Sequence, residues 1–191
     1  MTQTPVKLTF EEYLTYDDGT DNRYELEDGV LIPMTPASPI HSDIIELLYD
    51  SFKAEIKRLG LDWKVKQGDV GIRTRLSRSR QPDIAIIQAE DWRRLRQFKK
   101  SAILEVPALL VVEVVSPGED NENRDYVKKM TEYEEFGIAE YWIIDPLIEQ
   151  VMINFLMNGS YQNTIFTGQQ RIISQLFPDL NLTVEQIFMA E

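Results

Sequence analysis

The sequence predicts a mixed α/β fold in which a mixed β-sheet is flanked by helices and accompanied by β-hairpins. Short apolar runs that suit buried strands alternate along the chain with longer segments of helical periodicity. Two hairpin signals, Asp28-Gly29 and Asn158-Gly159, each lie between strand-like segments. The 191 residues contain no repeat, low-complexity tract or linker. We therefore expect a single domain that spans residues 1–191.

The first sixty residues are expected to begin with helical and hairpin elements. Thr9-Phe10-Glu11-Glu12 has the form of a capping box, in which side chains satisfy the free backbone donors that open a helix. Asp28-Gly29 suits a type I′ turn, which needs positive φ at both central residues. Gly60 ends a long run of apolar residues at helical spacing. The expected elements are a short helix from Thr9 to about Leu14, a hairpin of residues 23–27 and 30–34, and a long helix from about Ile40 to Leu59.

The rest of the chain alternates strands and helices. The expected strands are residues 63–67, 70–74, 83–88, 108–115, 141–144 and 172–176, with a hairpin of residues 151–156 and 161–167. The expected helices are Asp125 to Phe136, ended by Gly137, and about Val184 to Met189. Residues 75–80 and 119–124 are expected to be charged loops, and residues 89–107 to be polar and helical in part.

Composition limits the compartment and the chemistry. A chain with 43% hydrophobic and 27% charged residues is ordinary for a soluble globular protein. The absence of cysteine excludes disulfide frameworks, thiolate zinc sites and cysteine nucleophiles, and it fits a reducing compartment. No window approaches ~20 continuous apolar residues, and the N-terminus lacks the apolar core of a signal peptide. We expect a cytoplasmic protein with no membrane partner.

The charge is unevenly distributed. The net charge of −12 by itself disfavours a polyanionic partner, because acidic proteins repel phosphate. Residues 73–100 nevertheless carry nine bases and three acids, a local charge of +6 in a chain whose remainder carries −18. Such a band suits a nucleic-acid phosphate track formed by Arg73, Arg75, Arg78 and Arg80. The alternative is that these side chains form an ordinary solvated surface and a loop.

Two carboxylates lie where a fold least favours them. Asp83 begins an apolar strand in Gln81-Pro82-Asp83, and Glu113 lies inside the apolar run of residues 109–115. A buried, ionised carboxylate is unfavourable by several kcal/mol or more unless a cation neutralises it. A bound hard metal ion, Mg²⁺ or Mn²⁺, is the most economical explanation.

A catalytic cation is expected beside such a pair. Side chains alternate along a strand, so Glu113 and Val115 share a face, but position 115 offers no lysine. The next helix carries Asp125, Lys129 and Tyr133 at i, i+4 and i+8, which places them along one helical face that can pack over the sheet. The alternative is that Asp125 and Lys129 form an exposed pair and that Tyr133 lies at the edge of the core.

An ordered set of motifs resembles a known family. Gln81-Pro82-Asp83 with Glu113-Val114-Val115 resembles the PD-(D/E)XK nuclease signature, although lysine is usual at the position of Val115. The wider set is similar to the Uma-type restriction endonucleases, a bacterial family long carried as a domain of unknown function. That set comprises Tyr24-Glu25-Leu26 with Asp28-Gly29, Ser38-Pro39 with His41, residues 110–117, Asp125 with Lys129 and Tyr133, Gly137, residues 140–146, and Phe177-Pro178-Asp179-Leu180. The resemblance covers almost the whole chain.

The resemblance implies a restriction-endonuclease-like core, Mg²⁺-dependent (or Mn²⁺-dependent) phosphodiester hydrolysis and homodimers. It implies that Asp83 and Glu113 bind the metal and that the Val114 carbonyl is a third ligand. It also implies that Glu25 is an additional acidic residue near the metal and that Lys129 is the catalytic lysine. It also places His41, the only histidine, near the acidic cluster, whereas a lone histidine there more often caps or packs a helix. Tyr141 and Trp142 are expected in the core, not in a base-stacking surface.

Three functions remain open from the sequence. The first is a metal-dependent endonuclease that hydrolyses DNA. The second is a catalytically silent nucleic-acid-binding or dimeric interaction module that keeps the nuclease fold, which the missing strand lysine and the acidic net charge would suit. The third is a hydrolase that acts on a small phosphorylated ligand.

Overall fold

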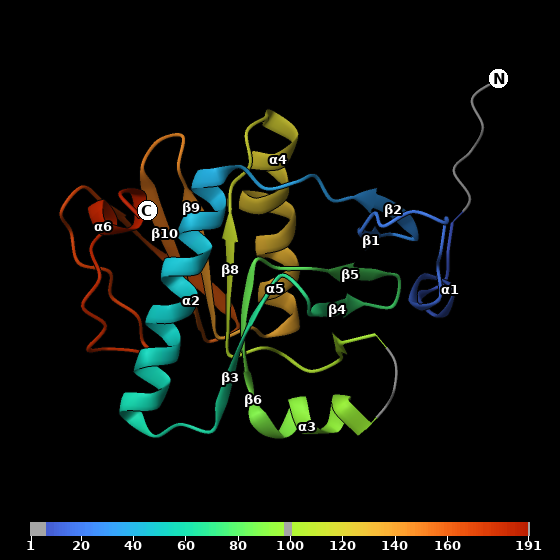
Figure 1. Cartoon of the computed structure of the whole chain (residues 1–191), viewed down its shortest axis with the longest axis horizontal. Coiled ribbons are helices and arrows are strands. Elements are labelled where there is room, and N and C mark those ends of the chain that lie inside the picture. Colours follow the sequence, from blue (N-terminus) through green and yellow to red (C-terminus); the bar gives the residue numbers. More distant parts are fainter. Residues whose placement is uncertain (1–6, 98–100, 191) are drawn as a thin grey trace.

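Two β-sheets with helices between and beside them make up the structure, a computed structural model that describes residues 7–97 and 101–190 (Figure 1). The strands are β1 Tyr24–Glu27, β2 Val30–Pro33, β3 Trp63–Gln67, β4 Gly71–Arg75, β5 Arg78–Arg80, β6 Ile84–Gln88, β7 Ile103–Leu104, β8 Leu110–Val114, β9 Glu140–Asp145, β10 Gln150–Met157 and β11 Ser160–Thr167. The helices are α1 Phe10–Leu14, α2 Pro39–Leu59, α3 Ala89–Gln97, α4 Glu119–Asn123, the π-helix η1 Arg124–Lys129, α5 Met130–Phe136 and α6 Val184–Phe188. The expected mixed α/β class is confirmed.

The larger sheet has six strands in the order β11-β10-β9-β8-β6-β3, and the smaller has five in the order β2-β1-β5-β4-β7. Strands β8 and β9 are parallel, whereas β6 pairs antiparallel with β8. The smaller sheet is also mixed, because β4 and β7 are parallel and its other pairs are antiparallel. The residue before β6 is Asp83, so the sheet brings it to the end of β8 that carries Glu113 and Val114.

Helices cover the two faces of the larger sheet separately (Figure 1). The amphipathic helix α2 packs Ile44, Leu48 and Phe52 against one face, in a core with Val112 and Val114. On the opposite face, Tyr133 of α5 packs with Val111, Val115 and Tyr141. Because side chains alternate along β8, Glu113 lies on the α5 face with Val115, as the sequence predicted.

Local signals in the sequence produced the expected local structures. Thr9 and Glu12 form a complete capping box at α1. Asp28 and Gly29 have φ values of 50° and 84°, as a type I′ turn requires, and Asn158 and Gly159 have 54° and 85°. Gly60 ends α2 in the left-handed region with φ of 64°. Tyr141 and Trp142 are fully buried, which confirms their place in the core.

Several expected elements were wrong. In place of the loop predicted over residues 75–80, Arg75 ends β4 and a turn leads into β5, which pairs with β1 and β4 and holds the buried Ser79 and Arg80. Residues 119–123 form α4, because the following helical segment extends back into them. Residues 172–176 form no strand: the amides of Gln175 and Leu176 donate to the Glu140 carboxylate instead of to a neighbouring strand. The expected helix from Asp125 begins as a π-helix. Residues 98–100, which end the basic band, lie outside the described residues.

Within the described residues, none of the helices combines the length and apolar character needed to cross a membrane.

Candidate active site

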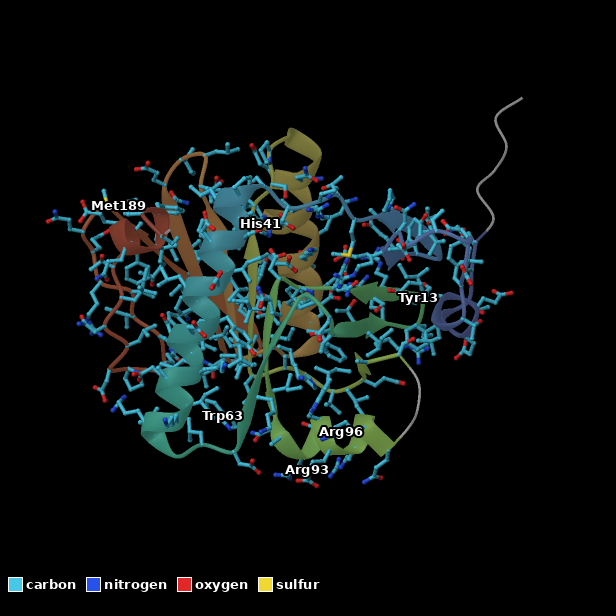
Figure 2. All side chains as sticks on the ribbon, viewed as in Figure 1. Tyr13, His41, Trp63, Arg93, Arg96 and Met189 are labelled. Atoms are coloured by element: carbon cyan, nitrogen blue, oxygen red, sulfur yellow. The ribbon has the colours of Figure 1, made fainter. Side chains whose placement is uncertain are left out.

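Asp83 is held in place by a backbone amide and a histidine. Its Oδ2 accepts a hydrogen bond of 2.7 Å from the Val114 amide, and His41 Nε2 lies 3.0 Å from Oδ1. His41 lies in the first turn of α2, at the end of that helix nearest α4 (Figure 2). The contact joins α2 to the end of the larger sheet and orients the carboxylate. His41 therefore packs beside the acidic cluster, as the family resemblance implied.

Glu113 is buried on the α5 face of the sheet, with a relative exposure of 4%. The Tyr133 hydroxyl donates a hydrogen bond of 2.8 Å to its Oε1, and Lys129 Nζ lies 2.8 Å from its Oε2. Both carboxylate oxygens are thus oriented by the helical segment that packs over the strand. Tyr133 is fully buried, so it is a direct partner of the carboxylate and not a residue at the edge of the core.

Lys129 lies at the centre of the cluster. Its Nζ is 2.8 Å from Glu113, 3.3 Å from Glu25 and 3.4 Å from Asp125. Lys129 and Asp125 have relative exposures of 3% and 1%, so the alternative of an exposed helical pair is wrong. The adjacent helical segment thus brings an ammonium group to Glu113, whereas the residue that follows β8 on the same face is Val115.

The π-helix supplies more than the lysine. Single π-helical turns are rare and often lie at functional sites. In η1, Arg124 Nε donates to Asp125 Oδ1 at 3.2 Å, and Arg124 borders the same cavity as Lys129. Arg124 was not among the residues expected at the site, although its position next to Asp125 was an available signal. Asp125 thus connects two cations, Arg124 and Lys129.

A cavity of about 410 Å³ adjoins this cluster. Its lining comes from the N-terminal hairpin, the start of α2, the Gln81-Pro82-Asp83 segment, β8 and η1. The predicted site residues that border it are Glu25, His41, Asp83, Glu113, Val114 and Lys129. The fold therefore brings into one space residues that are far apart in the sequence.

Burial and neighbouring charges shift the pKa values of the buried groups in this cluster. Burial raises the pKa of Glu113 to about 8; Lys129 opposes this rise, and Asp83, Asp125 and Glu25 add to it. Burial by itself would raise the pKa of Glu25, but Lys129 and Arg80 outweigh it and hold that pKa below its usual range. Burial would likewise lower the pKa of Lys129, yet the three carboxylates around it raise that pKa. Lys129 therefore stays charged.

The oxygen donors of the cluster suit a hard cation that keeps several bound water molecules. Among residues 7–97 and 101–190, no three His, Cys, Asp or Glu side chains converge as a complete metal-binding cage. Two carboxylates, Asp83 and Glu113, border the cavity together with Val114, which is buried at the end of β8. Mg²⁺ is commonly held by one or two carboxylates, with water and substrate phosphate completing the shell. The residues present therefore fit Mg²⁺ or Mn²⁺ and do not fit a metal that needs an all-protein cage.

The arginines predicted to contact nucleic acid are paired with carboxylates. Arg80 has 0% exposure and contacts Glu132, Glu25 and Glu27, which corrects its assignment to a surface phosphate track. Arg78 pairs with Asp28 and the buried Glu132. The remaining pairs are Arg73 with Glu105 and Arg75 with Glu135. Arg80 lies inside because the desolvated carboxylates of the hairpin and α5 need a cation.

Comparisons with known proteins identify the fold and the family of the chain. The structure is similar to the crystal structure of "a putative nuclease belonging to DUF820" from Anabaena variabilis, with a TM-score of 0.76, 19% sequence identity, and coverage of 96% of this chain and 98% of that chain. A sequence model of the Uma2 family, described as "Putative restriction endonuclease", matches residues 10–185. The chain belongs to this family, as its motifs predicted. A search of curated proteins found no significant match.

Proposed function

We propose that this chain, as one domain spanning residues 1–191, is a metal-dependent endonuclease that hydrolyses DNA phosphodiester bonds. The membership of the Uma2 family and the nuclease-like fold support a nuclease function. The observation that carries the finer proposal is the convergence of Asp83, Glu113 and Lys129 on one cavity, with Glu113 buried between a lysine and a tyrosine.

Each residue of the cluster has a physical role in this proposal. Asp83 and Glu113 would hold Mg²⁺ or Mn²⁺, with the Val114 carbonyl as a third ligand. Such an ion supplies Lewis acidity, which polarises the phosphate and makes water more acidic. Lys129 steadies negative charge that develops on the phosphate, and Glu25 and Asp125 fix the position of its ammonium group.

Neighbouring side chains position these groups. Tyr133 orients Glu113, and His41 orients Asp83 through the 3.0 Å contact. Arg124, fixed by Asp125, borders the cavity where a phosphate would approach the lysine. These contacts limit the freedom of the reacting groups, which lowers the entropic cost of reaching the transition state.

Plasmid cleavage tests the proposal. The purified protein should nick or linearise plasmid DNA with Mg²⁺ or Mn²⁺ and should lose this activity in EDTA. Asp83→Asn and Glu113→Gln, which keep the shape of the side chains, should abolish cleavage, whereas Glu135→Gln on the exposed part of α5 is the matched control. Cleavage that survives both site substitutions would reject the assignment of the metal ligands.

One observation favours a second candidate, a catalytically silent nucleic-acid-binding or dimeric module. Lys129 is bound to three carboxylates, and Val115 replaces the usual strand lysine, so the ammonium group could serve the stability of the fold alone. Metal titration separates the candidates. The endonuclease should gain thermal stability with Mn²⁺, and the gain should disappear in Asp83→Asn. DNA binding that is sensitive to salt, without metal stabilisation or cleavage, would favour the silent module.

We also propose that the chain acts on DNA as a homodimer, which the family resemblance implies, and that it does so in the cytoplasm, which suits a chain without cysteine. Analytical ultracentrifugation of the full chain measures the first point directly. A monomer at all concentrations up to those used for cleavage would contradict the dimer.

A further inference from the structure

A second cavity, of about 220 Å³, lies beside the candidate active site. Three tyrosines contribute to its walls: Tyr13 from α1, Tyr16 from the turn after α1, and Tyr24 from β1. Figure 2 shows Tyr13 beside the smaller sheet, on the far side of the molecule from α2. The opposite wall comes from β4, β7 and Ser101. This cavity is built by the small sheet and α1; Glu25, the residue of that sheet which the proposed hydrolysis uses, borders the first cavity and not this one.

The two cavities share a wall. Asn22 and Gln81 border both of them. Gln81 is fixed on two sides, since its amide donates to Glu25 Oε1 at 2.9 Å and its Nε2 donates to the Gly68 carbonyl at 2.8 Å. Gln81 precedes Asp83 by two residues, which an extended chain spans in at most about 7 Å. A group in the second cavity is therefore within reach of the nucleotide next to a phosphate bound at Asp83.

The tyrosine rings are held in a defined arrangement. The Tyr13 hydroxyl donates to the Tyr24 carbonyl at 2.8 Å, and the Tyr24 hydroxyl donates to Asp18 at 2.5 Å. Tyr16 and Tyr24 meet at an interplanar angle of 89°, with ring centroids 5.7 Å apart. A perpendicular pair covers a face of only one of its two rings, so ring faces remain available to another planar group. Tyr16 is 44% exposed.

The chemistry of the lining favours a base over a phosphate. Among the described residues that border this cavity, there is no lysine or arginine, and Asp69 would repel an anion. Aromatic faces stack on any base, and the oxygens of Asp69 and Asn22 can accept hydrogen bonds from the amino groups of a base. At about 220 Å³ the space is smaller than the 300–1,000 Å³ typical of ligand pockets, and it suits one ring system instead of a whole nucleotide.

We propose that this cavity is a nucleobase-binding subsite, which takes an unstacked base next to the scissile phosphate. The inference rests on the proposed nuclease function and names its substrate class: a nucleic-acid strand that presents an unpaired or flipped base. A base inside an intact duplex has both faces stacked, so it must leave the stack to enter the cavity. The subsite therefore favours single-stranded or locally melted DNA.

Binding of a short single-stranded oligodeoxynucleotide containing one 2-aminopurine tests the subsite. The full chain is titrated in Ca²⁺ to limit cleavage, and the fluorescence of the 2-aminopurine and the dissociation constant are measured. Tyr16→Ala should weaken binding about tenfold and remove the fluorescence quenching that stacking causes. Tyr16→Phe keeps the ring and should restore both. Leu76→Ala, at an 85% exposed turn residue on the other end of the small sheet, should bind as the unmodified protein does.

The outcomes separate this inference from the proposed function. Equal affinity and quenching for Tyr16→Ala and the unmodified chain would overturn the subsite, even if the protein cleaves DNA. Quenching that depends on Tyr16 would support the subsite even if Asp83→Asn leaves cleavage unchanged and the metal assignment fails. An oligonucleotide with an abasic position in place of the 2-aminopurine should bind Tyr16→Ala and the unmodified chain equally. A difference between them would show that Tyr16 acts on something other than the base, and would also overturn the subsite.

Discussion

Arg80→Met tests whether a buried ion network holds the small sheet to the helix behind it. Arg80 has 0% exposure and makes two contacts to Glu132, at 2.9 Å from Nε and 2.5 Å from Nη2. Its Nη1 lies 3.2 Å from Glu25 and 3.0 Å from Glu27. Methionine keeps much of the length and volume of the side chain but removes the charge, so the substitution isolates the electrostatic contribution.

The expected loss of stability is large. Removing one partner of a buried ion pair typically costs about 3–5 kcal/mol, because the remaining charge stays desolvated. Glu132 keeps the contacts from Arg78 and the Thr74 hydroxyl, and Glu25 keeps Lys129, so we expect the lower part of this range. For a chain of this size each kcal/mol shifts Tm by about 2–4 °C, which gives a fall on the order of 10 °C.

Urea unfolding followed by tryptophan fluorescence measures the free energy of unfolding. Arg75→Met is the matched control: Arg75 and its partner Glu135 have side-chain exposures of 43% and 53%, and exposed pairs contribute at most about 1 kcal/mol. The loss for the double variant Arg80→Met/Glu132→Gln should be smaller than the sum of the losses for the two single variants, because both single substitutions remove the same Arg80–Glu132 contacts.

Two results would refute this reasoning. A loss for Arg80→Met no larger than that for Arg75→Met would show that the buried network contributes little. Unchanged stability together with a weaker, less salt-dependent affinity for DNA would show that Arg80 contacts phosphate, as the sequence pattern first indicated.

Three further predictions concern the site, the hairpin turns and pH. Tyr133→Phe should lower cleavage or Mn²⁺ affinity by about 10–100-fold, because Glu113 loses the hydrogen-bond donor that orients it. Titration with Mn²⁺ and plasmid cleavage measure the two effects. Unchanged values for both would show that Tyr133 has no role in the site. Gly29→Ala should destabilise the protein more than Gly159→Ala in thermal unfolding. Both glycines have φ near 85°, so the backbone strain is similar. A Cβ at Gly29 would lie 3.0 Å from the Leu8 carbonyl oxygen, whereas a Cβ at Gly159 would meet no atom within 4 Å. Equal losses of stability in the two variants would mean that backbone strain accounts for the whole effect and that the contact with Leu8 adds nothing. Burial by itself would raise the pKa of Glu27, but Lys128 and Arg80 hold it below its usual range, so the ionised form stabilises the fold above the unfolded value of about 4.3. Glu27→Gln should therefore be less stable than the unmodified chain at neutral pH, with a difference that shrinks as the pH falls through the acid range; a difference that grows on acidification would contradict the sign.

The sequence predicted most of the elements whose signals are local. The capping box at Thr9, the turns at Asp28-Gly29 and Asn158-Gly159, and the helix stop at Gly60 depend on residues within a few positions, so they could be predicted without knowledge of the fold. The strand expected at residues 172–176 is absent because the amides of Gln175 and Leu176 donate to the Glu140 carboxylate of a distant strand, which no local pattern reports.

Part of the candidate site could likewise be predicted from the sequence, and part could not. The alternation of β8 placed Glu113 on the face of Val115, and helical spacing aligned Asp125, Lys129 and Tyr133, so the sequence by itself determined which residues could meet. It also determined the family, because the ordered motifs extend along almost the whole chain. The roles of these residues in hydrolysis, and the single domain over residues 1–191, stay predictions.

Which charged groups are desolvated, and which groups neutralise them, could be learned only from the tertiary structure. Arg80 resembles the half-buried Arg78 and the exposed Arg75 in sequence, but it pairs with Glu132, 52 positions away, and is fully buried. Lys129 could have been a surface residue; the packing of η1 against β8 and β1 places it between three carboxylates instead. Charge and spacing are properties of the sequence, whereas burial and partners depend on contacts between distant segments, and these contacts set the energy of an ion pair.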